Sequence, residues 1–319
     1  MLTRAFFFGA ACAAAALLAA PNATLAQPAA TVPAGSASKA GDEDLQAAIT
    51  KSNAYTALMN RTLRAIQSWE RYASWVDMKK GPTGKERYIT YGLYSLYDVA
   101  GEIKKAEEAM AREPKLPAID ATVGNYIKAY QELAPSITRG ERYYDRKDYR
   151  DDNLAEGQRL HALMVPAAKT FLEERAKLDA LMRVYKKGLD QRELASVEQR
   201  EGRSARWQVR NIMINARAVM DLMPSNESPV VDLKVFNAAI ADYAGAVREM
   251  DAFKDKNPSG VPFIESQASS WLGKLRDFSD KLAKSKGDVR RGAARDANWI
   301  VNNYNTMVSL SETAIRTAR

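Results

Sequence analysis

The sequence predicts an all-α protein, an elongated multi-helix bundle of about eight helices. Apolar side chains recur every three or four positions through almost all of the chain after Asp44, which is the period of an amphipathic helix. In 44–78 this stripe continues for about 35 residues, a rod of roughly 50 Å that only a bundle could bury. No stretch alternates apolar and polar residues for long enough to form a strand, and 261–264 contains a proline.

The helices follow from the stripes and from the residues that interrupt them. The first, over 44–78, ends before the glycines and proline of 81–84, which lower helical propensity and remove a backbone donor. A second is expected over 85–112, and a third from Asp120, an acid suited to a helix start, to 146. The later ones are expected over 151–187, 190–223, 232–255, 263–286 and 288–317, with kinks at Pro135 and Pro166.

The chain is best divided near 224–231, where Pro224 ends a helix. This gives a first helical region over 44–224 and a second over 225–319, which could also form one domain. The pattern Pro-x-x-Asp occurs at Pro117 and again at Pro229, each time before a helix, a polar loop and another helix. Two related helical halves are therefore one expectation.

Residues 1–26 have the layout of a signal peptide for export. A positive charge at Arg4 precedes the apolar run of 5–20, and small residues precede a cleavage site after Ala26. The run is shorter than the ~20 residues of a membrane span, so the mature chain is expected to be periplasmic and not transmembrane. Residues 27–43 lack large apolar side chains and are expected to form a flexible tether. Lipid anchoring at Cys12 is less favoured, because the apolar run continues past it.

The composition argues against several classes of enzyme. Among 319 residues there is one histidine and one cysteine, and the cysteine leaves with the signal, so one chain cannot build a His/Cys zinc site. The Gly-x-Ser-x-Gly, P-loop and dinucleotide-binding patterns are absent as well. We therefore assign no catalytic residue, no metal ligand and no cofactor.

The densest group of chemistry-bearing residues surrounds the turn expected at 143–152. Aromatic rings beside carboxylates suit recognition of a sugar or peptide, and four aspartates could hold a hard cation, although the spacing of a calcium loop is missing. The structural alternative is that the tyrosines pack and the aspartates cap the next helix. A lone histidine on an apolar face is likewise more often a core residue. The candidate ligand-binding residues are Tyr143, Tyr144, Asp148, Tyr149, Asp151, Asp152, His161, Asn53, Tyr91 and Arg87.

The chain is basic, with a formal net charge of +8. A basic stripe is formed by Arg200, Arg203, Arg206 and Arg210, but Glu198 and Glu201 interleave with it, so a solvated, ion-paired helix explains it equally well. A basic surface attracts an envelope polymer, an anionic lipid or a protein partner, and export argues against nucleic acid.

Several segments resemble the YiiG family of bacterial envelope proteins, a domain family of unknown function. The similar pieces are 51–55, 81–87, 91–94, Asp120 with Tyr126 and Leu133, 143–144, 148–149, 151–152 and 160–161. The similarity extends from about 45 to 310, and it implies an exported helical protein, often with a lipid at its N-terminus. No functional residue is carried over from it.

Three functions remain open from the sequence. The favoured one is a non-enzymatic binding protein with a groove near the 143–152 turn and the 81–87 loop. The alternative is a hydrolase of cell-wall polymer, which requires two carboxylates from distant helices about 5–9.5 Å apart and a raised pKa on one of them. The third is a structural subunit of a larger envelope complex, which would expose a large apolar patch.

Overall fold

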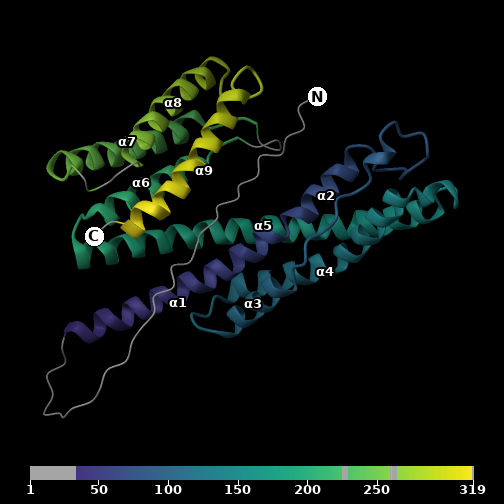
Figure 1. Ribbon diagram of the computed structural model, residues 1–319, viewed down its shortest axis with the longest axis horizontal. Coiled ribbons are helices and arrows are strands. Elements are labelled where there is room, and N and C mark those ends of the chain that lie inside the picture. Colours follow the sequence, from purple (N-terminus) through teal and green to yellow (C-terminus); the bar gives the residue numbers. More distant parts are fainter. Residues whose placement is uncertain (1–33, 225–228, 259, 261–263, 318–319) are drawn as a thin grey trace, which may run out of the picture. The chain divides into compact units, whose positions relative to one another are not determined.

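The computed structural model describes residues 34–224, 229–258, 260 and 264–317, and in this part the protein is all-α, as the periodicity predicts (Figure 1). Two isolated backbone bridges, between Asp77 and Gly81 and between Val230 and Asp288, are the only β pairings among the described residues. Within the same ranges we find no helix whose apolar length would span a bilayer. The expected signal peptide and Cys12 lie outside the described residues.

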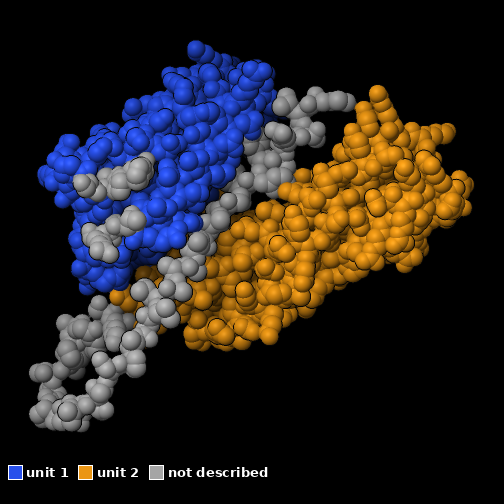
Figure 2. Space-filling model, in the orientation of Figure 1, with its two compact units in different colours: residues 1–18, 190–319 blue, residues 19–189 orange. Residues whose placement is uncertain are grey.

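The chain forms two compact units, which divide between Leu189 and Asp190 (Figure 2). The sequence favoured a division near 224–231 instead. The difference arises because α6, Ala205–Met220, buries Ile212 and Val219 in the same core as the helices that follow it. Helix α5, Ala155–Glu201, continues through the division without a break.

The N-terminal unit contains α1 (Ala34–Arg61), α2 (Leu63–Ala73), α3 (Ala100–Ala111), α4 (Pro117–Arg146) and the first part of α5. Helix α1 begins ten residues earlier than the sequence suggests, so 34–43 of the expected tether is helical. The core is rich in aromatic rings, and the Tyr126 and Phe171 rings stack with centroids 5.1 Å apart. Figure 1 shows α4 and the start of α5 side by side as a hairpin, in which α5 returns along α4.

Two buried cations tie the first helices to the rest of this unit. The Lys51 ammonium on α1 donates to the carbonyls of Arg112 and Pro114 and to the Asp120 carboxylate, at 3.1, 2.9 and 2.9 Å. The Asp120 carboxylate also accepts from the Tyr55 hydroxyl and the Leu116 N–H. All three ammonium hydrogens therefore have acceptors, which a buried cation requires.

The second buried cation, Arg175 on α5, reaches across to α1 and α4. Its guanidinium donates to the Met59 carbonyl at 2.6 Å, to the Tyr126 hydroxyl at 3.1 Å and to Asp179 at 2.9 Å. The Thr62 hydroxyl meets the same Tyr126 oxygen at the junction of α1 and α2. Lys51, Tyr55, Asp120, Tyr126 and Arg175 thus link α1, α4 and α5 through buried or half-buried hydrogen bonds.

The prediction of one helix over 85–112 is wrong for the first half of that range. Residues 92–99 are not helical, a short 3-10 turn covers Ile89–Tyr91, and only α3 matches the prediction. Gly92 has φ +53°, and a Cβ there would lie 3.0 Å from the Cβ of Tyr144. The segment is fixed by α2 instead, since the Ser68 hydroxyl bonds both the N–H and the carbonyl of Tyr94 at 3.0 Å.

The C-terminal unit contains the end of α5 together with α6, α7 (Leu233–Lys256), α8 (Ile264–Lys284) and α9 (Ala294–Thr317). Trp271 is fully buried at its centre and donates to the Ile300 carbonyl at 3.0 Å. The Ser204 and Asp232 side chains cap α6 and α7 by accepting backbone N–H groups of the first turn.

The two Pro-x-x-Asp patterns do not begin their helices in the same way. Asp232 is the N-cap of α7, whereas Asp120 lies in the first turn of α4 and binds the buried Lys51. The relation between two helical halves stays a prediction.

Candidate functional site

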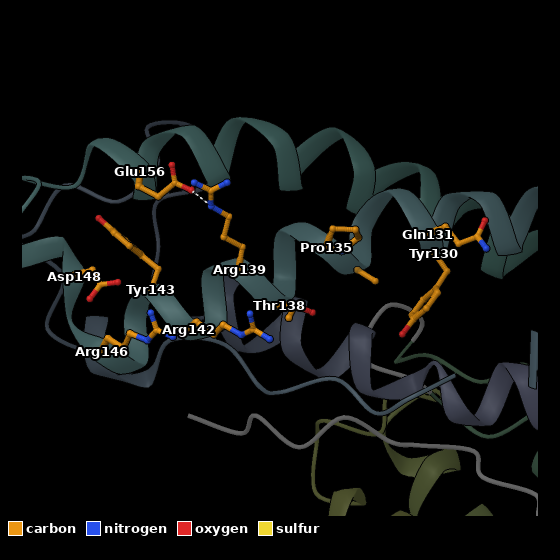
Figure 3. Close-up of a pocket in the computed structure, with 11 residues that line it drawn as sticks. Tyr130, Gln131, Pro135, Thr138, Arg139, Arg142, Tyr143, Arg146, Asp148 and Glu156 are labelled. Atoms are coloured by element: carbon orange, nitrogen blue, oxygen red, sulfur yellow. Dashed lines mark ion pairs between the residues drawn. The ribbon is translucent and has the colours of Figure 1, made fainter. Parts of the chain in front are cut away.

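A cleft of about 750 Å³ runs along α4 in the N-terminal unit (Figure 3). This volume lies within the range of small-molecule sites, roughly 300–1,000 Å³. Most of its wall comes from α4, and the start of α5 contributes Glu156. The cleft is lined by Tyr130, Gln131, Ala134, Pro135, Thr138, Arg139, Arg142, Tyr143, Arg146, Asp148 and Glu156.

The α4 helix places these side chains on one face because they recur every three or four residues. At 1.5 Å per residue the face from Tyr130 to Arg146 extends for about 24 Å. Its character changes along the helix: Tyr130, Ala134 and Pro135 line one end, and the arginines line the other. The helix stops at Lys147, whose φ of +64° is left-handed and turns the chain toward α5.

The cationic end of the cleft contains one internal ion pair. The Arg139 guanidinium lies 2.5 Å from the Glu156 carboxylate, which Figure 3 marks with a dashed line, and Glu156 also binds Arg159 through two hydrogen bonds. The hydrogen bonds from Arg159 lower the pKa of Glu156, against a smaller opposing effect of burial, and the charge of Arg139 adds to the lowering. Glu156 is therefore an anion that holds the α4–α5 corner.

Arg142 and Arg146 are different, because both are exposed and neither has a hydrogen-bond or carboxylate partner in the described part of the chain. They lie four residues apart on the same face of α4, one helical turn from each other. Because Arg139 and Glu156 neutralise each other, the other charged side chains of the cleft are Arg142, Arg146 and Asp148. This end of the cleft therefore has an excess of positive charge. This end of the cleft can accept a ligand carboxylate, phosphate or sulfate.

The turn singled out from the sequence proves mainly structural. The Asp152 carboxylate accepts from the Leu154 and Glu156 N–H groups at 2.9 Å and from the Tyr143 hydroxyl at 2.8 Å. Burial opposes its ionisation, but these hydrogen bonds prevail and lower the pKa of Asp152. Asp152 thus caps the start of α5, as the structural alternative proposed. Its oxygens are directed to the protein, and no cluster of three metal-ligating side chains occurs among the described residues.

Tyr144 and His161 are core residues. Tyr144 is 2% exposed and meets the Trp75 ring edge-on at 5.0 Å. The His161 Nδ1 lies 3.0 Å from the Tyr72 hydroxyl, and burial lowers the pKa of His161. Tyr149 packs its ring near those of Tyr143 and Tyr144. These three residues pack against other side chains of the N-terminal unit and do not line the cleft.

The remaining candidates do not join the cleft. Tyr91 is exposed and stacks on Tyr88 with centroids 4.9 Å apart, and the Arg87 guanidinium lies 5.3 Å from the Tyr88 ring. Asn53 is half-buried on α1, and Asp151 is an exposed turn residue. Of the ten candidates, therefore, the structure places Tyr143 and Asp148 in the cleft.

The arginines of α4 are not among the candidate residues predicted from the sequence. The spacing of Arg139, Arg142 and Arg146 puts them on one helical face, and this was the signal available. In the basic stripe that the sequence did indicate, three of the four arginines are ion-paired, as the alternative interpretation predicts, and Arg200 donates to the Ser196 hydroxyl at 2.6 Å. Arg203 pairs with both Glu198 and Glu249, Arg206 pairs with Glu201, and Arg210 pairs with Glu193.

Comparison with known proteins agrees with the resemblance seen in the sequence. A family model described as a protein of unknown function, DUF3829, matches residues 46–310. The chain is 28% identical over 280 residues to the uncharacterized protein YiiG of Escherichia coli strain K12, an alignment that covers 81% of this chain and 76% of YiiG. No solved structure matches the chain. Because the family model spans most of its length, the chain belongs to the DUF3829 family of proteins of unknown function.

Proposed function

We propose that this protein is an exported, non-enzymatic binding protein, and that the α4 cleft holds an anionic amphiphile of the cell envelope, such as an anionic lipid. The observation that carries the proposal is the pair of exposed guanidinium groups, Arg142 and Arg146, that have no partner among the described residues of the cleft wall. The anionic group of the ligand binds there, where Arg can form paired, charge-assisted hydrogen bonds.

The other end of the cleft supports the choice of an amphiphile over a simple anion. The aromatic ring of Tyr130, the methyl group of Ala134 and the ring of Pro135 line it. Burial raises the pKa of Tyr130 to about 12, so the phenol is neutral at physiological pH. An acyl chain laid along this face removes apolar surface from water while its head group meets the arginines.

The hydrolase alternative receives less support from the cleft. A general acid needs a raised pKa, and the pKa of Glu156 is lowered by its two arginine partners. Two acids that face each other raise the pKa of one of them by sharing a proton. In the cleft Glu156 is paired with Arg139 and not with Asp148, so this cause of a raised pKa is missing.

Calorimetric titration with dodecyl phosphate tests the binding proposal. We expect wild-type protein to bind it, and Arg142→Gln with Arg146→Gln to weaken binding at least tenfold. The matched control is Lys104→Gln with Lys105→Gln, which removes the same charge from exposed positions on α3 and should change affinity less than threefold. Equal loss in both double variants, or no binding by the wild type, contradicts the proposal, as does equal affinity for uncharged dodecyl maltoside.

Export is tested separately by intact-mass spectrometry of protein from the periplasmic fraction. We expect a mature chain that begins at Gln27. Recovery of the whole chain from the cytoplasmic fraction alone contradicts this part of the proposal.

A further inference from the structure

A second cationic surface lies on the N-terminal unit, where the extended segment after the 3-10 turn crosses α2 and the end of α1. We call it the Arg–Tyr strip, and it consists of Arg61, Arg64, Arg71, Tyr91, Tyr94 and Tyr97. None of these six residues lines the α4 cleft. Tyr91 and Tyr97 are 47% and 53% exposed and Arg61 is exposed, whereas the other three residues are half-buried, so solvent reaches the strip without covering it evenly.

Each arginine of the strip is held at two points. The Nε of Arg61, Arg64 and Arg71 donates to the carbonyls of Asp98, Ser95 and Tyr91, respectively. The same guanidinium groups lie over tyrosine rings: Arg64 and Arg71 are 4.0 and 4.2 Å from the Tyr94 centroid, and Arg61 is 4.8 Å from that of Tyr97. Their planes are therefore fixed before any ligand arrives, which reduces the entropy cost of binding.

Most of the donors on these arginines remain available. A guanidinium carries five N–H groups. Arg61 and Arg71 each use one of them in a hydrogen bond, and Arg64 uses a second one to bind Gln67. None of the three is paired with a carboxylate within the described residues. The acids that touch the segment accept from other donors: Asp98 from the Ala100 N–H and Glu141 from the Ser95 hydroxyl.

The spacing suits a ligand with closely repeated charges. Arg61 and Arg64 are separated by about 4.5 Å of helical rise, and Arg71 lies about 10 Å farther along. A compact anion can meet one of these groups, whereas an extended chain can meet all three. We propose that the Arg–Tyr strip binds a flexible phosphate polymer, which the arginines contact in sequence along α1 and α2. This surface acts in addition to the α4 cleft and does not depend on it.

The experiment measures binding of long-chain inorganic polyphosphate by fluorescence anisotropy at several salt concentrations. We expect Arg61→Gln, Arg64→Gln and Arg71→Gln together to weaken binding at least tenfold, and to make the plot of log affinity against log salt shallower by about 2. The matched control, Lys104→Gln, Lys105→Gln and Lys128→Gln, removes three exposed charges from the same unit and should change affinity less than threefold.

Two further variants keep the test decisive. Should the triple arginine variant lose its helical circular dichroism, Tyr97→Leu replaces it, because the exposed Tyr97 ring lies against Arg61 and Arg64. We expect this variant to fold and to bind about threefold more weakly. Arg142→Gln with Arg146→Gln removes two charges from the cleft. It should weaken polyphosphate binding less than threefold, and so separate this proposal from that for the cleft.

The proposal is overturned by absence of binding to the wild type, by equal losses in the arginine and lysine triple variants, or by unchanged binding in Tyr97→Leu. Equal affinity for poly-glutamate overturns the assignment to phosphate.

Discussion

Asp152 illustrates how a chemically suggestive residue can serve the fold. It receives two backbone N–H groups and one phenol hydroxyl, which accounts for its lowered pKa more simply than a ligand does. We expect Asp152→Ala to reduce the free energy of unfolding by about 1 kcal/mol in urea denaturation at neutral pH. The neighbouring Asp151→Ala should change it by less than about 0.5 kcal/mol, because Asp151 is exposed.

The effect of Asp152→Ala depends on pH in a definite direction. Because the folded protein lowers the pKa of this carboxyl, its contribution is complete above the unfolded pKa of about 3.9 and is lost as pH falls through the folded pKa. The difference in unfolding free energy between wild type and Asp152→Ala should thus shrink below about pH 4. A difference that grows on acidification would contradict the capping role.

Removal of Lys51 should strongly reduce the free energy of unfolding of the N-terminal unit, because its ammonium is buried and its partners stay behind. Lys51→Met leaves the carbonyls of Arg112 and Pro114 without their donor and removes the countercharge of Asp120. We expect a loss of about 3 kcal/mol in the free energy of unfolding. Lys128→Met, on the exposed face of α4, is the control and should be nearly neutral. A loss similar to that of the control would mean that the pair is not buried in solution.

At the scale of elements, the segment over 85–99 separates what periodicity can predict from what it cannot. Its tyrosines recur every three residues, which resembles a helical stripe. The segment is not helical because side chains of α1, of α2 and of Trp75, distant in sequence, donate to its carbonyls, and because Gly92 passes close to Tyr144. Such long-range side-chain bonds leave no local pattern in the sequence.

Ser68→Ala tests this explanation of the segment. It removes both hydrogen bonds to the Tyr94 backbone and leaves those groups half-buried, so we expect a loss of about 2 kcal/mol. Hydrogen exchange of the Tyr94 amide should accelerate in parallel. Thr90→Ala, at an exposed position, is the control, and unchanged Tyr94 exchange in Ser68→Ala would contradict the bonding scheme.

The candidate site was predictable only in part, for a related reason. The sequence indicated the turn that follows α4, and Tyr143 and Asp148 do line the cleft. The arginines of α4 were overlooked because charge on a helix usually faces solvent without a function. Two facts make Arg142 and Arg146 candidates for binding: they line a concave wall, and Glu156 is already paired with Arg139. Both facts can be seen only in the tertiary structure.

At the scale of the whole molecule, the periodicity of apolar residues predicts the all-α fold but does not predict where the chain divides into two units. A proline at 224 suggested a boundary, yet the two hydrophobic cores assign α6 to the C-terminal unit, and α5 crosses the division as one helix. A boundary within a continuous helix has no breaker residue to mark it.

Separate cores should respond separately to a core substitution. Trp271→Ala should cost about 4 kcal/mol in the C-terminal unit, because the ring is fully buried there. In hydrogen exchange followed by mass spectrometry, we expect faster exchange over 205–317 and little change over 45–182. Equal acceleration in both ranges would show that the protein unfolds as a single cooperative unit.

Native mass spectrometry of the protein purified from the envelope fraction of cells that make it tests the anion-binding cleft most directly. The wild type should retain a non-covalent adduct with the mass of an acidic amphiphile, and Arg142→Gln with Arg146→Gln should lose it. A ligand-free wild type, or an adduct of equal occupancy in the double variant, would show that the α4 cleft is not the binding site.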